Sequence, residues 1–359
     1  MSKKSRIAVG LSGGVDSAVA ASLLCDAGHD VVGVIMTIWD GRAMATEAHR
    51  HACYGPGEKQ DVEDARGVAD KLGIPFVVVD LADAYNTQIL DPCRDAYAAG
   101  LTPNPCVHCN AAMKFGLIPQ RLRDCGEQVD GFATGHYALV EKDEERGRWL
   151  LKKGKDPRKE QSYFLSRLTQ EQLSTTVLPL GRMEKSQVRE IAAAHGFSVA
   201  EKEESQDFAA GGYQSLFCGD ARPGPIVDQD GRELGQHQGI EYFTIGQRRG
   251  LGIAHSQRLY VTGLDPEQNA VVVGPVEKLI GTELTAGRLN WISIDGLTGP
   301  MSVEAKIRYR HSGSRATAEP CGEDRVRVRF DEPQQAITPG QAVVLYDGDS
   351  VVCGGVIER

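Results

Sequence analysis

The amino-terminal part of the chain alternates short β-branched segments with longer amphipathic ones. The β-branched segments are predicted to be buried strands, and the amphipathic ones helices. In one charged segment, Ala65, Val68, Ala69 and Leu72 share a helical face, and Gly73 follows as a stop signal. This alternation predicts a doubly wound parallel sheet, which binds ligands beyond the carboxyl ends of its strands. The predicted strands span 6–11, 30–36, 76–80 and 131–134, and the predicted helices span 15–27, 61–72 and 113–125.

The pattern changes after about residue 211, where glycine and proline become frequent and strand-like segments replace helices. From about residue 286, apolar and polar positions alternate as in small β-barrels, over 303–309, 325–330, 342–346 and 351–357. We therefore predict an α/β domain over residues 1–212, a small central domain over 213–285 and a C-terminal β-barrel domain over 286–359.

Composition narrows the functional classes. The 359 residues carry 40 Lys and Arg against 49 Asp and Glu, a net charge of −9, so a nucleic acid must be bound by basic groups gathered on one face. No run approaches the roughly 18 apolar residues of a membrane span, and no secretory signal is recognised, so we expect neither membrane insertion nor secretion. Nine cysteines are too few for a disulfide scaffold, and we expect a cytoplasmic protein with reduced thiols.

The strongest local motif lies between the first predicted strand and the first predicted helix. Its paired glycines allow close approach of an anion, the amides of the helix start point at that anion, and Ser12 and Ser17 can donate hydroxyl hydrogen bonds to it. A glycine-rich turn without a ligand is the alternative interpretation. The motif lacks the lysine of a Walker loop and the GxGxxG spacing. It reads Gly10, Leu11, Ser12, Gly13, Gly14, Val15, Asp16 and Ser17.

This loop resembles the SGGxDS loop of the PP-loop ATP pyrophosphatases, which split ATP between the α and β phosphates to adenylate a substrate. The resemblance implies that residues 10–17 bind ATP and that Asp16 helps to hold Mg²⁺ or shapes the loop. Met36 would pack near the adenine, although an ordinary core methionine is an equal alternative.

Further motifs resemble those of the tRNA-specific 2-thiouridylases, over almost the whole chain. The clearest is a TPNPxxxCNxxxKF-like stretch at 102–115, and others lie at 133–137, 161–165, 244–252, 308–310 and 339–341. The resemblance implies ATP-dependent 2-thiolation of the wobble uridine in tRNAs for lysine, glutamate and glutamine. ATP would adenylate the 2-carbonyl oxygen, a sulfur nucleophile would attack the carbon, and AMP and pyrophosphate would be released.

The resemblance also implies a catalytic site. Cys109 would be the catalytic cysteine, joined in the catalytic set by Cys106 and Asp16. A thiolate is needed, and we expect a helix start near Met113 and the cation of Lys114 to lower the pKa of Cys109. Gly135 would contact the nucleotide and His136 the target uridine, while Asn104, Pro105 and Cys106 would cradle the flipped base.

The implied tRNA contacts lie in two regions. Lys159, Glu160 and Gln161 match one tRNA-binding segment, while Arg308, Tyr309 and Gln341 match contacts near the C-terminus. Residues 148–159 hold six basic side chains against Asp156 alone, a net charge of +5, which favours a phosphate track over a solvated loop.

The pattern departs from the family at Ala209, where a second cysteine is usual four residues after a serine. One hypothesis is that Cys53, Cys106 and Cys109 bind an iron–sulfur cluster with an open iron. Another keeps a persulfide on the Cys-x-x-Cys pair, with Cys106 or Cys218 resolving it. Zinc is a third option, but no second cysteine pair completes a tetrahedral site.

The resemblance names a cysteine desulfurase or a sulfur relay protein as the sulfur donor. Two other classes compete with this interpretation. One is a different PP-loop ligase that acts on a small molecule, and the other is a nonenzymatic tRNA-binding protein. Release of AMP and pyrophosphate only in the presence of tRNA distinguishes the thiouridylase from both.

Overall fold

The computed structural model describes residues 4–41, 52–202, 207–210, 212–217 and 221–358. The chain divides into two compact units. The first comprises residues 1–89, 106–212 and 349–351, and the second comprises 90–105, 213–348 and 352–359. Because both units are discontinuous in sequence, this division does not test the three predicted domain boundaries, which stay predictions.

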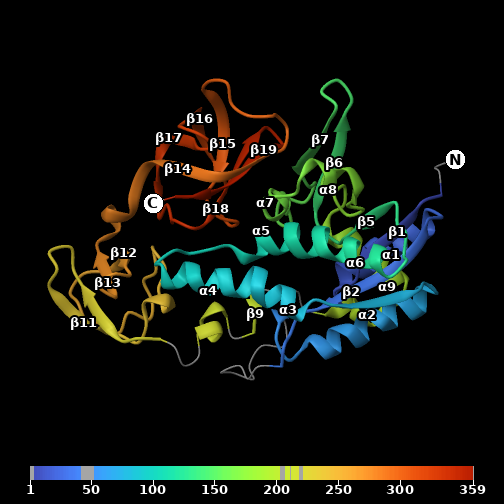
Figure 1. Ribbon diagram of the computed structural model, residues 1–359, viewed down its shortest axis with the longest axis horizontal. Helices are drawn as coiled ribbons and strands as arrows, with labels where there is room; N and C mark the ends of the chain where they lie inside the picture. The colour runs from blue at the N-terminus through green and yellow to red at the C-terminus, as the bar shows by residue number, and fades with distance from the viewer. Residues whose placement is uncertain (1–3, 42–51, 203–206, 211, 218–220, 359) are drawn as a thin grey trace. The chain divides into compact units, whose positions relative to one another are not determined.

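The first unit is built on a five-stranded sheet in which every pairing is parallel. The strand order is β4-β2-β1-β5-β8 (Figure 1). From β1 the chain first adds β2 and β4 on one side, and it later adds β5 and β8 on the other side, as in a doubly wound fold. The predicted sheet is confirmed, and its switch point lies at the carboxyl end of β1. The strands are β1 (Arg6–Gly10), β2 (Asp30–Thr37), β4 (Phe76–Asp80), β5 (Gly131–Ala133) and β8 (Thr176–Val177).

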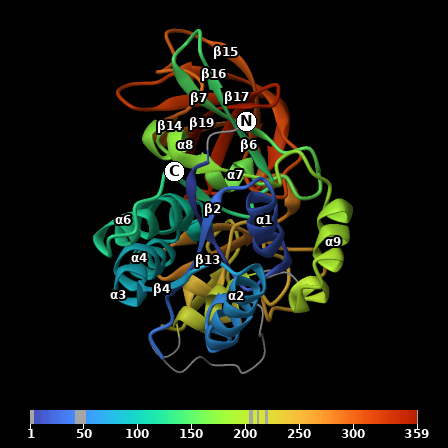
Figure 2. The ribbon, with the colours of Figure 1, turned by 90° about the vertical axis from the view of Figure 1, so that its right-hand side faces the viewer.

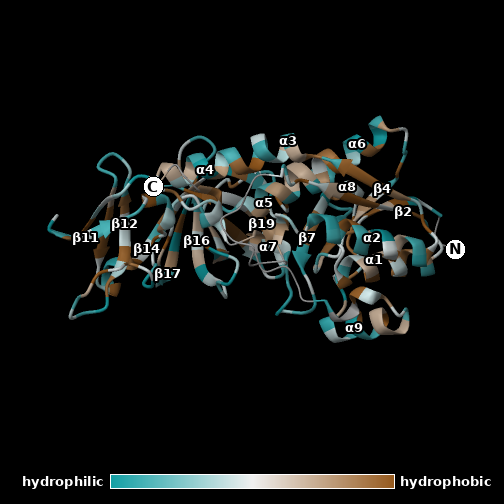
Figure 3. Ribbon diagram, turned by 90° about the horizontal axis from the view of Figure 1, so that it is seen from below, coloured by the Kyte–Doolittle hydropathy of each residue, from teal (hydrophilic) through white to brown (hydrophobic). Residues whose placement is uncertain are grey.

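Helices pack on both faces of this sheet, as Figure 2 shows for α1 and α6. On one face, α1 (Val15–Asp26), α2 (Glu58–Leu72) and α9 (Lys185–Ala194) share a buried core with Ile7 and Val9 of β1. On the other face, the rings of Phe115 and Phe132 pack edge to face, with their centroids 5.4 Å apart. The strands β2 and β4 are mostly hydrophobic in Figure 3. Residues 31–35 of β2 are buried, as expected of a strand covered on both sides, whereas Val78 of the edge strand β4 is 41% exposed. Gly73 ends α2 in a left-handed conformation at φ 66°, as its position predicted.

The third predicted helix starts earlier than expected. In place of a helix over 113–125, the chain forms α5 (Pro105–Cys109), the π-helical segment η2 (Asn110–Leu117) and α6 (Ile118–Asp124) in direct succession. Proline suits the first turn of a helix because it needs no intrahelical donor there, so Pro105 begins the segment. Cys109 therefore lies inside a helical segment and not ahead of one.

Smaller elements complete the first unit. The hairpin β6 (Ala138–Asp143) and β7 (Arg148–Lys153) is antiparallel, whereas β3 (Ala52–Tyr54) and β9 (Asp207–Ala209) form a parallel pair. No helix in the described part of the chain combines the length and apolar character needed to cross a membrane. The remaining helical turns are α3 (Ala82–Tyr85), η1 (Asn86–Leu90), α7 (Ser162–Leu165), α8 (Gln170–Thr175) and η3 (Ser198–Glu201).

The second unit is mainly β-structure. A four-stranded sheet of order β11-β10-β13-β12 buries Ile226, Val261 and Val271. Six further strands, in the order β14-β17-β16-β15-β18-β19, close into a barrel because β14 also pairs with β19. The predicted barrel is confirmed. The sheet strands are β10 (Gly224–Val227), β11 (Glu233–His237), β12 (Tyr260–Asp265) and β13 (Ala270–Gly274).

The four predicted barrel segments correspond to β15, β17, β18 and β19, whereas β14 and β16 were not predicted. Apolar side chains of the barrel strands fill one core. The strands are β14 (Ile280–Trp291), β15 (Met301–Lys306), β16 (Ser314–Pro320), β17 (Val326–Gln335), β18 (Ala342–Asp347) and β19 (Ser350–Ile357). The unit also contains α4 (Asp91–Ala98), η4 (Tyr213–Phe217), η5 (Ile240–Tyr242) and η6 (Val276–Leu279).

Candidate active site

The glycine-rich loop turns from β1 into α1 and is held in shape by its own serines. The Ser17 hydroxyl donates to the Gly14 carbonyl at 3.0 Å and accepts from the Ser12 amide at 3.1 Å. Ser17 is buried and its only hydroxyl proton is used within the loop, whereas Ser12 is exposed. In this conformation Ser17 therefore stabilises the loop, and anion binding by the two hydroxyls stays a prediction.

The loop forms the floor of a pocket of about 350 Å³, within the size range of small-molecule sites. Met36 and Gly135, the predicted nucleotide contacts, line it together with His136 and Gln161, which were predicted as tRNA contacts. Cys53, which was selected only as a possible cluster ligand, also lines the pocket. The lining residues that the sequence did not single out are Val34, Ile35, Ile38, Glu58, Asp61, Ile118, Phe132, Thr134 and Lys202.

Gly135 packs directly against the start of α1. A Cβ at this position would lie 2.7 Å from the Asp16 carbonyl carbon and 2.8 Å from the Ser17 amide nitrogen. Such contacts are shorter than real Cβ atoms tolerate, so only glycine fits here without displacing the loop. Gly135 thus shapes the pocket as well as lining it.

The Asp16 carboxylate is engaged by two side chains from distant segments. Its Oδ1 accepts a hydrogen bond from the Tyr137 hydroxyl at 2.7 Å and an ion pair from Lys185 Nζ at 2.6 Å. Lys185 is only 6% exposed, and no sequence signal pointed to it. This pairing favours the loop-shaping role of Asp16 over the metal-binding one, because the carboxylate charge is already compensated by a cation.

Charged residues form a second wall of the pocket. The Glu58 carboxylate accepts hydrogen bonds from the Ile38 and Trp39 amides, and burial raises the pKa of Glu58. Lys202 bridges two acids of α2, Asp61 at 2.8 Å and Asp64 at 2.5 Å. These ion pairs fix the side of α2 that faces the phosphate loop.

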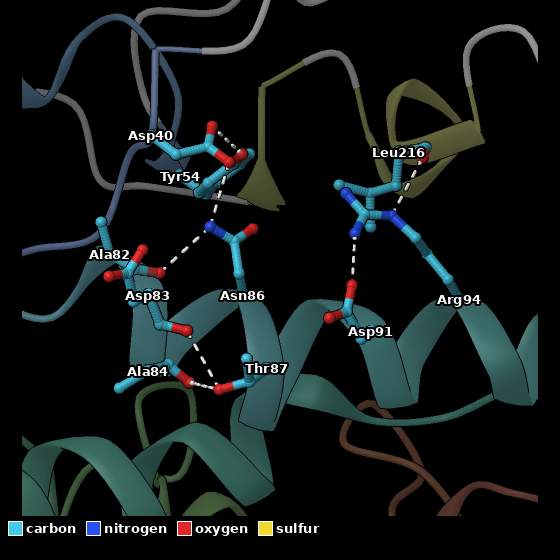
Figure 4. A network of polar contacts seen from close by, with 10 residues as sticks. All are labelled: Asp40, Tyr54, Ala82, Asp83, Ala84, Asn86, Thr87, Asp91, Arg94 and Leu216. Carbon is cyan, nitrogen blue, oxygen red and sulfur yellow. Dashed lines mark hydrogen bonds and ion pairs between the residues drawn. The ribbon is translucent and has the colours of Figure 1, made fainter.

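A polar network anchors the short strand β3, which carries Cys53. The Tyr54 hydroxyl donates to Asp40 Oδ1 at 2.9 Å, and the Asn86 amide donates to Asp40 Oδ2 at 3.0 Å. Figure 4 shows Asp40 between these two partners. The exposed Cys53 is thereby held at the pocket wall.

The predicted lowering of the Cys109 pKa is wrong in this structure. Burial raises the pKa of Cys109 to about 11, the positive charge of Lys114 lowers it and the nearby thiol of Cys53 raises it. The expected helix start is absent, because Cys109 follows four residues of α5 and so receives no N-terminal dipole. Desolvation therefore outweighs the cation.

His136 lies in the same environment. Burial, followed by the positive charge of Lys114, lowers the pKa of His136 to about 3, so its imidazole is neutral at pH 7. Its Nδ1 shares a 2.8 Å hydrogen bond with Thr134 Oγ1. A neutral imidazole can accept a proton or hydrogen-bond a base edge, which suits the predicted place beside the target uridine.

Comparison with known proteins agrees with this architecture. Family profiles match along the chain: the "tRNA methyl transferase HUP domain" over residues 5–209, the "tRNA methyl transferase PRC-barrel domain" over 218–275 and the "Aminomethyltransferase beta-barrel domain" over 281–357. The tRNA-specific 2-thiouridylase MnmA of Moorella thermoacetica is 46% identical, covering 98% of both chains. This chain belongs to the tRNA-specific 2-thiouridylase family.

Other thiouridylases also match over nearly the whole chain. The enzyme of Symbiobacterium thermophilum is 45% identical over 99% of this chain and 92% of its own, and that of Clostridium acetobutylicum is 42% identical over all of both. Among solved structures, a 4-thiouridine synthetase–RNA complex with bound ATP is 15% identical, with a TM-score of 0.35 over 59% of this chain and 45% of that one. The resemblance that the motifs predicted is confirmed.

The structure separates the thiouridylase cysteines into different environments. Among the described residues, no three His, Cys, Asp or Glu side chains are grouped so that they could hold a metal ion. Cys53, Cys106 and Cys109 are all described, so their placement does not form the three-ligand cluster site of the first hypothesis, nor a zinc site. Ala209 is buried in β9 and pairs with Tyr54, next to Cys53. Cys218 lies outside the described residues.

The three residues of the first expected tRNA-binding segment are all buried or half-buried. Glu160 is 7% exposed, and its carboxylate accepts from the Ser162 amide at 2.5 Å, so it stabilises the turn into α7. Gln161 lies in the pocket, where its Oε1 accepts from the Tyr137 amide at 3.0 Å. Lys159 is half-buried. Glu160 and Gln161 therefore face the protein.

The remaining expected contacts lie in the second unit, apart from Cys106. Arg308 and Tyr309 follow β15 in a turn, and Arg308 is exposed. The Gln341 amide donates to the Thr102 carbonyl at 3.0 Å and therefore tethers the segment that leads to Asn104 and Pro105. Cys106, the second residue of α5, is half-buried.

Three barrel arginines with alternating spacing are paired with glutamates. Arg325 contacts Glu358 at 3.0 Å, and Arg329 contacts Glu283 and Glu319, both at 3.4 Å. Arg327 lies 3.8 Å from Glu319. These pairs are typical of the solvated face of a sheet and compensate the positive charge that phosphate binding would use.

Proposed function

We propose that this chain catalyses the ATP-dependent 2-thiolation of the wobble uridine in tRNAs of the lysine, glutamate and glutamine type. The observation that carries the proposal is that a complete phosphate loop, His136 and Lys114 line one pocket, and that the charge of Lys114 acts on Cys109. This arrangement combines nucleotide activation with a cysteine nucleophile.

The first step is adenylation of the base. The start of α1 and the loop amides orient the α-phosphate of MgATP, which enters as substrate. The 2-carbonyl oxygen of the uridine attacks that phosphorus, the bond to the β-phosphate breaks, and pyrophosphate leaves. Adenylation turns a poor leaving group into AMP. The pocket residues supply position and charge, and the carboxylate of Asp16 holds the loop through Tyr137 and Lys185.

The second step transfers sulfur. A cysteine desulfurase or a sulfur relay protein loads Cys109 with a persulfide, and its terminal sulfur attacks C2 of the uridine while AMP departs. A second thiol then attacks Cys109 Sγ, releases the 2-thiouridine and leaves a disulfide, which an external thiol reduces. Cys106 is the described candidate for that thiol. Asn104, Pro105 and Cys106 would hold the flipped base, while Lys159, Arg308 and Tyr309 would contact the tRNA.

The cluster hypothesis is tested separately. The described cysteines do not fit a three-ligand site, and no step here passes through iron or zinc. Protein purified and reconstituted without oxygen should therefore contain far less than one cluster per chain, as measured by iron and acid-labile sulfide. A stoichiometric cluster that is lost in Cys53→Ala, Cys106→Ala and Cys109→Ala would contradict the persulfide route.

The function is tested with an unmodified tRNA transcript, MgATP and a persulfide donor. We expect 2-thiouridine at the wobble position, detected by mass spectrometry of nucleosides, with one AMP and one pyrophosphate formed per sulfur. Cys109→Ala should abolish thiolation. Cys125→Ala is the matched control, because Cys125 is exposed at the end of α6 and belongs to no part of the site.

Two outcomes would overturn the proposal. Pyrophosphate release with a small acceptor and without RNA would favour another PP-loop ligase. RNA binding without nucleotide turnover would favour a nonenzymatic tRNA-binding protein.

A further inference from the structure

Lys185 is a buried cation at the boundary between two functional segments. Its Nζ lies 2.6 Å from Asp16 Oδ1 in the phosphate loop, and its ammonium group lies 5.9 Å from the centre of the Tyr137 ring. A lysine that is 94% buried is costly unless its charge is compensated, and Asp16 supplies that compensation. The pair therefore fixes the carboxylate that follows the loop glycines.

The backbone of the same lysine is held by the basic segment. Lys185 begins α9, and its amide donates to Asp156 Oδ2 at 3.0 Å. The other oxygen of Asp156 accepts from the Arg158 amide at 3.0 Å. Asp156 is the acid that interrupts residues 148–159, yet it is only 2% exposed, so it anchors the segment internally. Lys155 and Arg158, on either side of it, are exposed, and the other four basic side chains of the segment are half-buried.

A second connection runs in parallel. Tyr137 donates its hydroxyl to Asp16 at 2.7 Å, while its amide donates to Gln161 Oε1 at 3.0 Å and its carbonyl accepts from the Gln161 amide at 2.9 Å. Residues 156–161 are thus joined to the phosphate loop at both ends, through Lys185 at one and Tyr137 at the other.

We propose that Lys185 is a positioning residue that couples RNA binding at residues 155–161 to nucleotide binding at the phosphate loop. The inference rests on the proposed function, because it takes RNA and ATP as the two ligands. RNA that orders the basic segment fixes Asp156 and Gln161, and through Lys185 and Tyr137 it fixes Asp16. The loop is then held in one conformation before ATP arrives, so less ordering is left for the nucleotide to complete.

The test measures affinity and not only turnover. The Kd of the α,β-methylene analogue of ATP is determined by titration calorimetry, with and without an unmodified tRNA transcript. We expect the transcript to lower this Kd about fivefold or more in the wild type. In Lys185→Met the ratio of the two Kd values should fall to about 1. A purely structural lysine would change both values alike and leave the ratio intact.

Two further variants complete the design. Lys71→Met removes another tertiary contact, the 2.5 Å hydrogen bond from Lys71 to the Gly196 carbonyl, but touches neither segment, so it should keep the wild-type ratio. Tyr137→Phe removes only the hydroxyl bond to Asp16 and should lower the ratio while leaving the fold intact. If Lys185→Met does not fold, the Kd ratio of Tyr137→Phe tests the coupling in its place.

The outcomes separate the inference from the function. The coupling is overturned if RNA does not change the Kd of the ATP analogue in the wild type. It is also overturned if Lys185→Met folds and keeps the wild-type ratio of the two Kd values. Both results would count even if thiolation proceeds. If Lys185→Met does not fold, an unchanged ratio in Tyr137→Phe overturns the coupling. Failure of the wild type to thiolate the transcript overturns the proposed function, and the measured ratio still decides the coupling.

Discussion

The surroundings of Cys109 shift the pKa of its thiol in opposite directions. Burial and the neighbouring Cys53 raise this pKa, while Lys114 lowers it, and the resulting pKa is about 11. At pH 7 roughly one such thiol in ten thousand is ionised. The Cys109 thiol is therefore almost entirely protonated at pH 7, and a protonated thiol is alkylated and oxidised slowly.

The first prediction concerns the alkylation of Cys109 by iodoacetamide, followed by peptide mass spectrometry. Because only the thiolate reacts, the rate should rise about tenfold per pH unit between pH 7 and 10. Lys114→Met removes the cation that stabilises the thiolate, so the pKa rises further and the rate at pH 9 falls about three- to tenfold.

Lys71→Met serves as the control for that experiment, since Lys71 is an exposed lysine of α2 that has no effect on Cys109. A Cys109 rate that is flat above pH 7, or that is unchanged by Lys114→Met, would contradict the described environment.

At the level of elements, the pattern of apolar residues predicted β1, β2, β4, β5 and α1 to within a few residues, but it missed the two-residue strand β8. It predicted the barrel as well, because alternation along a strand reflects burial on one side. It missed the true start of the helical segment at Pro105 and its π-helical turn, because tertiary packing selects among helical forms. Lys185 and Tyr137 were also missed as partners of Asp16, since 121 or more residues separate them and only the fold brings them together.

The second prediction concerns the turn after β5. Gly135→Ala places a methyl group against the start of α1, so the phosphate loop must shift to make room. We expect the Kd of the ATP analogue to rise about tenfold or more, as misplaced phosphate donors lose their geometry.

Gly67→Ala is the matched substitution, because a methyl group there meets nothing within 4 Å. It lies in the middle of α2 and should leave nucleotide affinity unchanged while stabilising the fold by up to about 1 kcal/mol. Equal nucleotide affinities in the two variants would show that Gly135 does not shape the loop.

At the level of the whole molecule, a net charge of −9 coexists with a segment of +5 over residues 148–159. RNA must therefore bind to a limited basic face, because the net negative charge of the rest of the protein repels its phosphates. Pairing of Arg325, Arg327 and Arg329 with glutamates removes those barrel arginines from the available positive charge.

The third prediction follows from this distribution. The logarithm of tRNA affinity should fall linearly with the logarithm of salt concentration, and Arg158→Gln should reduce that slope by about 1. Arg158 is 84% exposed although it lies 3.7 Å from Asp156, whereas Arg329→Gln removes an arginine that contacts both Glu283 and Glu319 and should leave the slope unchanged. Equal slopes for Arg158→Gln and the wild type would exclude Arg158 from the RNA interface.

The central claim is that ATP activates the 2-carbonyl oxygen of the uridine, and its most direct test follows that oxygen. A tRNA transcript carrying ¹⁸O at the 2-position of the wobble uridine is thiolated, and the AMP released is examined by mass spectrometry. The account predicts one ¹⁸O in the phosphate of each AMP, because the adenylate leaves with the base oxygen. Unlabelled AMP alongside full thiolation would contradict it.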